Sequence, residues 1–218
     1  MTWWTYIFPK TVFRTSSRFN QDIRVVEEYG KNKLLVNGAR QSGTYVEDLW
    51  KEAISAFGLT PSDSPYSIVV FGVAGGTVIH LLRNLYPLST VIGVDIDKTM
   101  IDIGKKYFGL DQLQNISFQV ADVRNFLNKE TKQYRYDIVV LDIFNGWSVP
   151  DFVFEDTFLD HLVGLRKANG TLIINYIGEK EYRPKSDILF TKLRERFPMV
   201  KDKVVYLNRL FFATGKSR

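Results

Sequence analysis

The stretch that most constrains the fold is residues 68–97, which read IVVFGVAGGTVIHLLRNLYPLSTVIGVDID. Its first residues belong to a largely apolar, β-branched run, Ser67–Phe71, without polar alternation, which is typical of a parallel strand buried on both faces. Gly72, Gly75 and Gly76 follow at once. Glycine lets the chain turn sharply and lets its backbone approach a ligand without a Cβ clash. The pattern therefore predicts a buried strand that runs into a close-fitting turn.

The rest of this stretch predicts a helix and a second strand. Residues Thr77–Tyr86 have helical periodicity and stop before Pro87, which cannot continue a helix. The run Val91–Val94 is again apolar, with Asp95 at its carboxyl end and Asp97 shortly after. Doubly wound sheets bind ligands at this edge, where an acid suits ribose hydroxyls. The unit predicts an adenosine-containing ligand; the alternative is a turn that only packs the helix on the strand.

The spacing of the glycines narrows the kind of adenosine ligand. The dinucleotide fingerprint G-x-G-x-x-G would need three glycines where this chain has Gly72, Ala74 and Thr77. A nicotinamide-dependent oxidoreductase is therefore a remote alternative. A turn with less room, followed by an acid about 20 residues later, suits a nucleoside without a diphosphate. We expect that ligand to be S-adenosylmethionine (SAM).

Composition excludes several classes of protein and site. The chain has 218 residues, 45% of them hydrophobic, which fits one α/β domain with a small appendage. It has no cysteine and only two histidines, so disulfides, thiolate nucleophiles and zinc–cysteine sites are excluded and no metal site is expected. The aromatic start lacks the features of a signal peptide, and no apolar run approaches a membrane span. We expect a cytoplasmic protein that does not contact a membrane.

The net charge is +5, and basic side chains gather in residues 180–218. Such a cluster can attract nucleic acid. Acidic residues are interspersed among them, however, as at Asp187, Glu195 and Asp202. We therefore favour a solvated helix face with a basic tail over a nucleic-acid partner.

Residues 1–45 predict a small β subdomain. Two β-like runs, Ile23–Glu27 and Lys33–Val36, flank a glycine-containing segment, which is a hairpin signal. Asn37-Gly38 is a second turn signal. Upstream, Thr5–Arg14 could add a strand that its proline confines to a sheet edge.

Residues 46–218 predict a Rossmann-like α/β sheet. An amphipathic helix, Val46–Phe57, comes first, and strands then alternate with helices. This order gives a parallel sheet with helices on both faces. Two closing runs joined at Asn208–Arg209 are expected to add an antiparallel hairpin at the sheet edge. The expected strands are Ile68–Phe71, Val91–Val94, Ile116–Val120, Asp137–Asp142, Gly170–Tyr176, Val204–Leu207 and Leu210–Thr214, and the helices among them are Val78–Tyr86, Lys98–Phe108, Val123–Leu127, Glu155–Leu165 and Ser186–Arg196.

Three acids stand in equivalent places, each at or just past the carboxyl end of an expected strand: Asp95, Asp122 and Asp142. Asp95 could accept both ribose hydroxyls, and Asp122 could accept the adenine amine, with Ile96 and Val123 framing the base. Asp142 would lie beside the glycine turn, at the reactive end of the ligand. Asp122 alone could also be the N-cap of the next helix, but three acids at one sheet edge favour a binding site.

Five short motifs carry a family resemblance. They are Asn37-Gly38-Ala39-Arg40-Gln41-Ser42, Tyr45-Val46-Glu47, Gly75-Gly76-Thr77, Val94-Asp95-Ile96-Asp97 and Ala121-Asp122-Val123-Arg124-Asn125-Phe126-Leu127. In order and spacing they resemble the class I SAM-dependent methyltransferase fold and, within it, the spermidine synthase family, over about residues 17–177. The resemblance implies cofactor contacts from Gln41, Gly72, Gly75 and Gly76, a substrate contact from Tyr45, and a homodimer.

The chain departs from that family in its acids. Members that make polyamines carry in the glycine motif an Asp that grips the aminopropyl amine, where this chain has Ala74. The loop after the fourth strand of that family has two acids; here Asp142 is kept and the second is Asn145. The stretch between Gln41 and Tyr45 is also shorter. A diamine needs carboxylates in place of its water shell, so these changes argue against a polyamine substrate.

We expect Asp142 and Asn145 to be catalytic in a transfer from the sulfonium of SAM. Such a transfer needs a nucleophile held in line and a site closed to water more than it needs acid–base help. Phe144 and Trp147 could stack on the substrate or gate the site; the alternative is packing beneath a loop.

Several functions stay open at this point. The first is a SAM-dependent methyltransferase acting on an amine or hydroxyl group of a small molecule. The second is an aminopropyltransferase that uses decarboxylated SAM, with acids from Asp142 and Asp151. The third is a non-catalytic nucleoside-binding or interaction protein. The fold does not decide among them, but Ala74 and Asn145 disfavour the second, and the retained cofactor acids disfavour the third.

Overall fold

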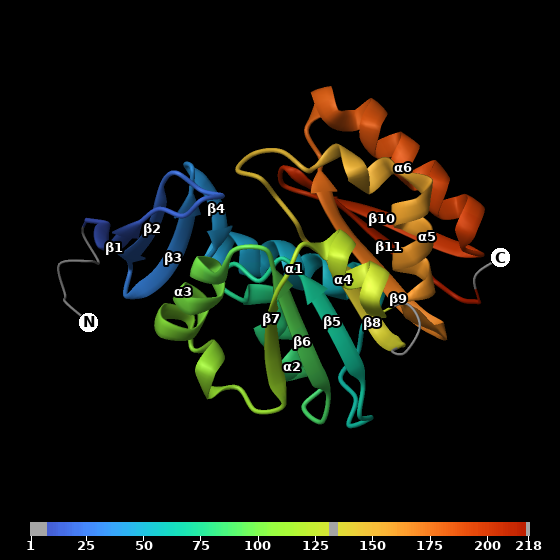
Figure 1. Cartoon of the computed structure of the whole chain (residues 1–218), viewed down its shortest axis with the longest axis horizontal. Coiled ribbons are helices and arrows are strands. Elements are labelled where there is room, and N and C mark those ends of the chain that lie inside the picture. Colours follow the sequence, from blue (N-terminus) through green and yellow to red (C-terminus); the bar gives the residue numbers. More distant parts are fainter. Residues whose placement is uncertain (1–7, 131–134, 217–218) are drawn as a thin grey trace.

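A computed structural model describes residues 8–130 and 135–216. It has an α/β fold in which a seven-stranded sheet lies between two layers of helices, with a separate four-stranded sheet beside it (Figure 1). The start of the first expected strand, residues 5–7, lies outside the described part of the chain.

The seven-stranded sheet is mostly parallel. Its strands are β5 (Ser67–Phe71), β6 (Thr90–Asp95), β7 (Ile116–Val120), β8 (Tyr136–Leu141), β9 (Arg166–Ile177), β10 (Met199–Val205) and β11 (Asn208–Thr214), in the order β10-β11-β9-β8-β5-β6-β7. Strand β11 pairs antiparallel with both β10 and β9, and the other neighbouring strands of this sheet pair in parallel. The prediction of a parallel sheet with an antiparallel C-terminal hairpin is confirmed. Strand β9 begins earlier than expected, because Arg166 pairs with Tyr136.

Helices cover both faces of this sheet, as in a doubly wound fold. They are α1 (Thr44–Phe57), α2 (Thr77–Leu85), α3 (Lys98–Phe108), α4 (Val123–Glu130), α5 (Asp156–Gly164) and α6 (Arg183–Arg196), with short 3-10 turns η2 (Leu110–Gln112), η3 (Asp151–Phe154) and η4 (Lys180–Tyr182). In β5, Ile68 and Val70 pack into the core under α1 and α2, whereas Val69 and Phe71 pack under α4, α5 and α6. Within the described residues, no helix is long and apolar enough to cross a lipid bilayer.

The N-terminal sheet is antiparallel and packs on α3. Its strands follow chain order: β1 (Lys10–Thr15), β2 (Ile23–Glu28), β3 (Lys31–Val36) and β4 (Ala39–Ser42). Met100 and Ile103 of α3 complete its core. Asp97, buried at the N-cap of α3, accepts hydrogen bonds from Ser17 and Asn20 and so ties this sheet to the glycine-turn half of the larger one. We keep the division of the chain after residue 45 as a proposal.

The C-terminal hairpin corrects one expected turn. The turn lies at Tyr206 and Leu207, whereas Asn208 and Arg209 belong to β11. The Arg209 side chain is buried and forms ion pairs with carboxylates of α6 and β10, which hold it in the strand. Tyr206 takes the positive φ that the turn needs, at 53°.

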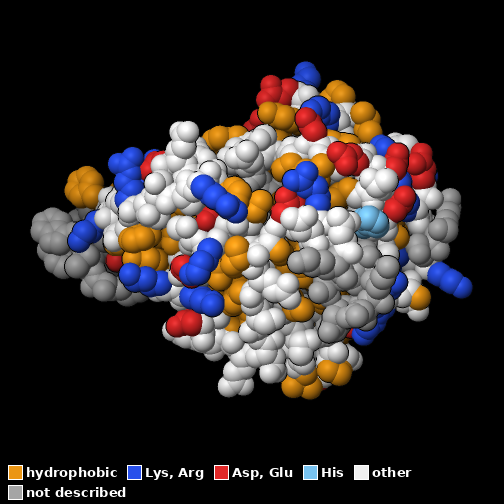
Figure 2. All heavy atoms as spheres, in the orientation of Figure 1, with side chains coloured by type: hydrophobic (Ala, Val, Ile, Leu, Met, Phe, Trp, Pro, Cys, Tyr) orange, Lys and Arg blue, Asp and Glu red, His pale blue; other side chains and the backbone are white. Residues whose placement is uncertain are grey.

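The basic side chains near the C-terminus are largely ion-paired. Arg183, Lys185, Lys192, Arg196 and Lys203 each contact a carboxylate. Figure 2 shows acidic and basic side chains interspersed over α5 and α6, at the upper right. This arrangement supports a solvated helix face at that end of the chain.

Candidate active site

Two adjoining cavities open at the carboxyl ends of the parallel strands. The large cavity has a volume of about 580 Å³ and the small cavity of about 240 Å³. Among the described residues, three line both: Gln41 from β4, and Asp142 and Phe144 from the loop after β8. Gln41 also donates a long hydrogen bond, 3.4 Å, to the carbonyl of Gly146 in that loop. Asp142 therefore stands where ligands bound in the two cavities would meet.

The small cavity gathers most of the side chains that the sequence assigns to the cofactor. Those that border it are Gln41, Gly72, Asp95, Ile96, Asp122, Val123 and Asp142. Gly75 and Gly76 are absent from the described residues that line it; they lie in the turn behind, enclosed by Ser42 and Leu110. The cofactor role of each of these residues stays a prediction.

Among the three glycines of the turn, Gly72 is the one at which a side chain would collide with backbone atoms rather than with other side chains. Its φ is 89°, and a Cβ atom there would lie 2.0 Å from the carbonyl oxygen of Asp142. The Asp142 N–H in turn donates to the carbonyl of Phe71 at 2.8 Å. The ends of β5 and β8 are thus locked together, which places Asp142 beside the glycine turn.

Asp95 braces the glycine turn with its carboxylate. Its Oδ2 accepts hydrogen bonds from the N–H groups of Val73 at 2.9 Å and Ala74 at 3.5 Å, and its Oδ1 accepts one from Asp97 at 2.9 Å. Burial raises the pKa of Asp95, and these hydrogen bonds oppose the rise. A carboxylate has about four acceptor sites on its two oxygens, so Oδ1 keeps one for a ligand hydroxyl, whereas Oδ2 is taken up by the turn.

Asp122 is engaged by the helix that follows it. Its Oδ1 accepts a hydrogen bond from the Arg124 N–H at 2.8 Å, as an N-cap does, and the Arg124 guanidinium bonds both carboxylate oxygens. These contacts lower the pKa of Asp122. The capping role foreseen as an alternative is therefore present together with a place on the small cavity, next to Ile96 and Val123.

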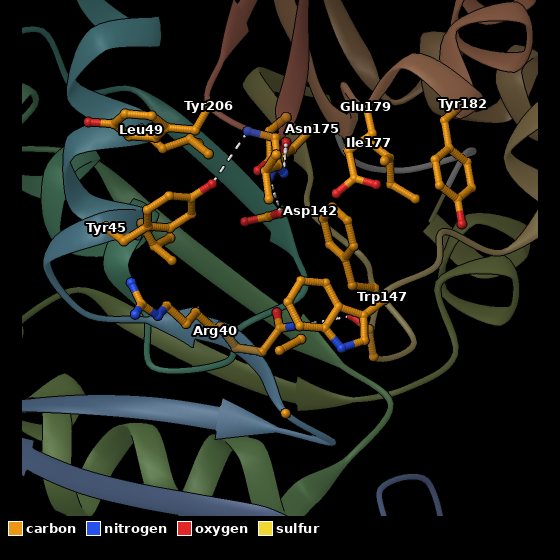
Figure 3. A pocket seen from close by; sticks show the side chains of 18 of the residues that line it. Arg40, Tyr45, Leu49, Asp142, Trp147, Asn175, Ile177, Glu179, Tyr182 and Tyr206 are labelled. Atoms are coloured by element: carbon orange, nitrogen blue, oxygen red, sulfur yellow. Dashed lines mark hydrogen bonds between the residues drawn. The ribbon is translucent and has the colours of Figure 1, made fainter. Parts of the chain in front are cut away.

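Aromatic side chains frame the large cavity. Tyr45 of α1 stacks on Tyr206 of the hairpin turn, with ring centroids 4.8 Å apart, and the Arg40 guanidinium lies over the Tyr45 ring. Trp147, 60% exposed, stands across the cavity from Tyr45 (Figure 3). Tyr182 adds a further ring to the lining. Such a rim can hold a cation or the stem of an alkyl amine.

Glutamates supply negative charge to the same cavity. Glu179 and Glu181 follow β9 and line it, and Glu179 reaches into the space beside Asp142 (Figure 3). Neither glutamate has an ion-pair partner in the part of the chain that the structure describes. With Asp142, the described residues that line the large cavity supply three carboxylates and one guanidinium, that of Arg40.

Asp142 is held by amides from two neighbouring strands. Asn175 of β9 donates its Nδ2 to Asp142 Oδ1 at 2.8 Å, and Asn208 of β11 donates its Nδ2 to Asn175 Oδ1 at 3.0 Å. Burial raises the pKa of Asp142 to about 6, and Asn175 and the nearby Trp50 N–H limit the rise. The Trp50 N–H is buried without a hydrogen bond of good geometry to any described residue. At neutral pH the carboxylate is mostly ionised, yet it can take up a proton.

The loop after β8 separates the two cavities. Asn145 and Ser148 exchange two backbone hydrogen bonds, at 2.8 and 3.1 Å. This tight turn places Asn145 on the small cavity and Trp147 on the large cavity, while Phe144 borders both. The catalytic role of Asn145 stays a prediction.

Sequence reasoning missed the contribution of β9 and of the hairpin. The missed residues are Asn175, Glu179, Glu181, Tyr182 and Tyr206. All but the last lie at or just past the carboxyl end of β9, so the argument used for the other parallel strands would have found them. Tyr206 carried no such signal, because it reaches the cavity from an antiparallel hairpin.

Several known proteins are similar to this chain in sequence. A model of the spermine/spermidine synthase domain matches residues 47–201. The polyamine aminopropyltransferase of Vibrio vulnificus is 31% identical over 119 residues, which cover 54% of this chain and 40% of that protein. The eEF1A lysine and N-terminal methyltransferase of Mus musculus is 25% identical over 146 residues, 63% of this chain and 21% of that protein. The chain thus spans less than half the length of these relatives.

Solved structures share the fold. Human methyltransferase-like protein 13 in complex with SAH has a TM-score of 0.66 and 20% identity, covering 79% of this chain and 83% of that one. Spermidine synthase in complex with the transition state analogue AdoDATO has a TM-score of 0.73 and 14% identity, covering 94% of this chain and 72% of that one. At these identities the likeness establishes the architecture alone.

Proposed function

The chain belongs to the spermine/spermidine synthase family, and on that premise we propose that it transfers a methyl group from SAM to an amine. The observation that carries the proposal is the position of Asp142, which borders both cavities. We assign the nucleoside to the small cavity and the acceptor to the large cavity. Relatives named as methyltransferases and as aminopropyltransferases support a SAM-related enzyme.

The small cavity fits the chemistry of an adenosine. Ribose hydroxyls and the adenine amine can donate hydrogen bonds, and Asp95 and Asp122 offer carboxylate acceptors at one edge. Ile96 and Val123 offer apolar contacts for the base. When bound, SAM supplies an electrophilic methyl carbon on a sulfonium.

The large cavity suits a cationic amine. Glu179 and Glu181 carry charge that no described residue neutralises, and Tyr45 and Trp147 offer aromatic faces. The sequence left an amine or a hydroxyl acceptor open, and these side chains favour the amine. The name of the mouse relative places its acceptor amines on a protein, so both free amines and peptides are candidate acceptors.

An ammonium acceptor has to lose a proton before its nitrogen can attack. Asp142, with a pKa of about 6 and a place at the junction, can take that proton near neutral pH. Asn145 can accept a hydrogen bond from the neutral amine. Phe144 and Trp147 would help to exclude water and to hold the nucleophile in line.

Aminopropyl transfer from decarboxylated SAM is the second candidate. The described residues that line the small cavity include four aspartates and no lysine or arginine that could pair with the carboxylate of SAM, which favours this candidate. The resemblance implies an Asp at position 74 in polyamine-making members, and the Ala74 of this chain argues for methyl transfer instead.

Calorimetric titration with SAM, decarboxylated SAM and methylthioadenosine separates the candidates. We expect SAM to bind most tightly. Tighter binding of decarboxylated SAM would replace methyl by aminopropyl transfer, and failure of all three to bind would leave a non-catalytic protein. Mass spectrometry of putrescine and of a lysine-containing peptide, each incubated with the protein and donor, then identifies the group transferred.

A further inference from the structure

Asp142 ends a row of side chains that crosses three strands. Asn208 lies on β11, Asn175 lies on β9, and Asp142 directly follows β8. The last β8–β9 pair, Leu141 with Ile174, brings Asp142 alongside Asn175. Hydrogen bonds of 3.0 and 2.8 Å join the row, and Asn175 at its centre is 6% exposed.

The row fixes the orientation of the Asn175 amide. Its Oδ1 accepts from Asn208 while its Nδ2 donates to Asp142. Rotating the amide by half a turn would set Oδ1 against an ionised carboxylate and Nδ2 against another amide donor, which would lose both hydrogen bonds. A donor therefore faces Asp142 for as long as that carboxylate is ionised.

Only one oxygen of Asp142 takes part in the row. Asp142 Oδ1 accepts the Asn175 hydrogen bond, whereas Oδ2 accepts none of good geometry in the described part of the chain. The residue borders both cavities. One oxygen is thus anchored, and the other is left for a ligand.

We propose that Asn175 and Asn208 are positioning residues, which hold Asp142 by one oxygen so that the other is presented to the acceptor amine. The Asp142 carboxylate, fixed in this way, would then deprotonate the acceptor amine without the second acid that the family has at the position of Asn145. That the free oxygen faces an amine rests on the proposed function. That the amides of Asn175 and Asn208 fix the Asp142 side chain is independent of the proposed function.

Other charged or titratable groups line the two cavities that Asp142 borders. Those on its two cavities are Arg40 of β4, Tyr45 of α1, Glu179, Glu181 and Tyr182 after β9, Tyr206 of the hairpin turn, Asp95 and Asp97 after β6, and Asp122 after β7. The variants below leave all of them in place, so a difference between proteins reports the amide row.

The variants Asn175→Leu and Asn208→Ala test the row in the ligand-free protein. The pH titration of the Asp142 carboxyl carbon, followed by 13C NMR and assigned with Asp142→Asn, should move to higher pH in both variants, further in Asn175→Leu, because the ionised form loses a donor. Asn169→Ala, exposed at the opposite end of β9, is the control and should titrate as the wild type does. An unchanged titration in Asn208→Ala would overturn the role of the outer amide, and an unchanged titration in Asn175→Leu would overturn the whole row.

Kinetics test the consequence for transfer. With putrescine or a lysine-containing peptide as the probe, kcat of Asn175→Leu should fall about tenfold or more, while KM for the donor stays within about twofold, because the hydrogen bond to a charged group is lost away from the nucleoside. The pH profile of kcat should shift in the same direction as the NMR titration. If the Asp142 titration shifts in the variants but the wild type transfers no group to either probe, the proposed function is wrong and the role of the amide row in holding Asp142 is kept. If kcat of both variants equals that of the wild type, the positioning role is wrong.

Discussion

Replacing Asp142 with asparagine should stabilise the protein at neutral pH while it abolishes transfer. Asparagine keeps the shape of the side chain, and its Oδ1 can still accept the hydrogen bond from Asn175. The change removes a charge that burial disfavours, which is the reason why the pKa of Asp142 is raised. The gain in stability therefore comes from the charge rather than from a new contact.

The size of the effect follows from two pKa values. The ordinary pKa of the Asp142 carboxyl is 3.8, and in the folded protein it is about 6. The Asp142 carboxyl binds its proton more tightly in the folded protein than in the unfolded chain. Its contribution to stability is therefore complete below the unfolded pKa of 3.8 and is lost as the pH rises through the folded pKa of about 6. Linkage gives a loss of about 1 kcal/mol at about pH 4.5 and of about 3 kcal/mol at about pH 7.5. Water that enters the cavities would solvate the Asp142 carboxylate and so reduce the loss of stability at about pH 7.5.

Urea unfolding of the wild type and of Asp142→Asn at both pH values measures this loss. The advantage of the variant in free energy of unfolding should grow by about 2 kcal/mol from the lower to the higher pH. Subtracting the free energy of unfolding of the wild type from that of the variant at each pH cancels the contributions of the other groups that titrate. Asp156→Asn is the control, because ion pairs with Lys192 and Arg196 lower the pKa of Asp156 and no such growth is expected. An advantage of Asp142→Asn that is the same at both pH values would refute the argument from the buried charge.

Three further changes probe other parts of the site. Asp95→Ala should abolish nucleoside binding in calorimetry, because it removes the acceptor at the ribose edge of the small cavity; unchanged affinity would rule that role out. Gly72→Ala should lower the free energy of unfolding by about 2 kcal/mol or more, because its Cβ would overlap the Asp142 carbonyl. Gly164→Ala, whose Cβ would meet nothing within 4 Å, is its control, and equal losses in the two would contradict the clash. Glu179→Gln should weaken binding of putrescine about tenfold and leave SAM affinity unchanged; the exposed Glu195→Gln is its control, and equal putrescine affinity in the two would exclude Glu179 from acceptor recognition.

The nucleoside edge of the sheet could be predicted because its signals are local. Asp95 and Asp142 each follow an apolar run, and a parallel order brings the carboxyl ends of such runs to one edge. In each of these cases neighbouring residues along the chain decide the outcome.

The amide row and the hairpin turn could not be predicted, because they depend on register between strands. Asn175 meets Asp142 only because Ile174 pairs with Leu141, and a shift of one residue would turn the Asn175 side chain to the other face. The turn at Tyr206 is fixed by the ladder between β10 and β11, although a tyrosine is a poor residue for a positive φ. Neither register can be read from one strand taken alone.

The division into two cavities lets the acceptor side of the site vary in sequence while the donor side is kept. The small cavity is built mainly at the ends of β5, β6 and β7, and the large cavity by β4, α1, the end of β9 and the hairpin turn, with Gln41, Asp142 and Phe144 in common. Tyr45 and Tyr206 line the large cavity and not the small one, so substitutions at these two positions can accumulate without disturbing the donor side. A lineage built on this plan could exchange one acceptor for another while it keeps the same donor, and a designer could reshape the wall at Tyr45 and Tyr206 with the chemistry left in place.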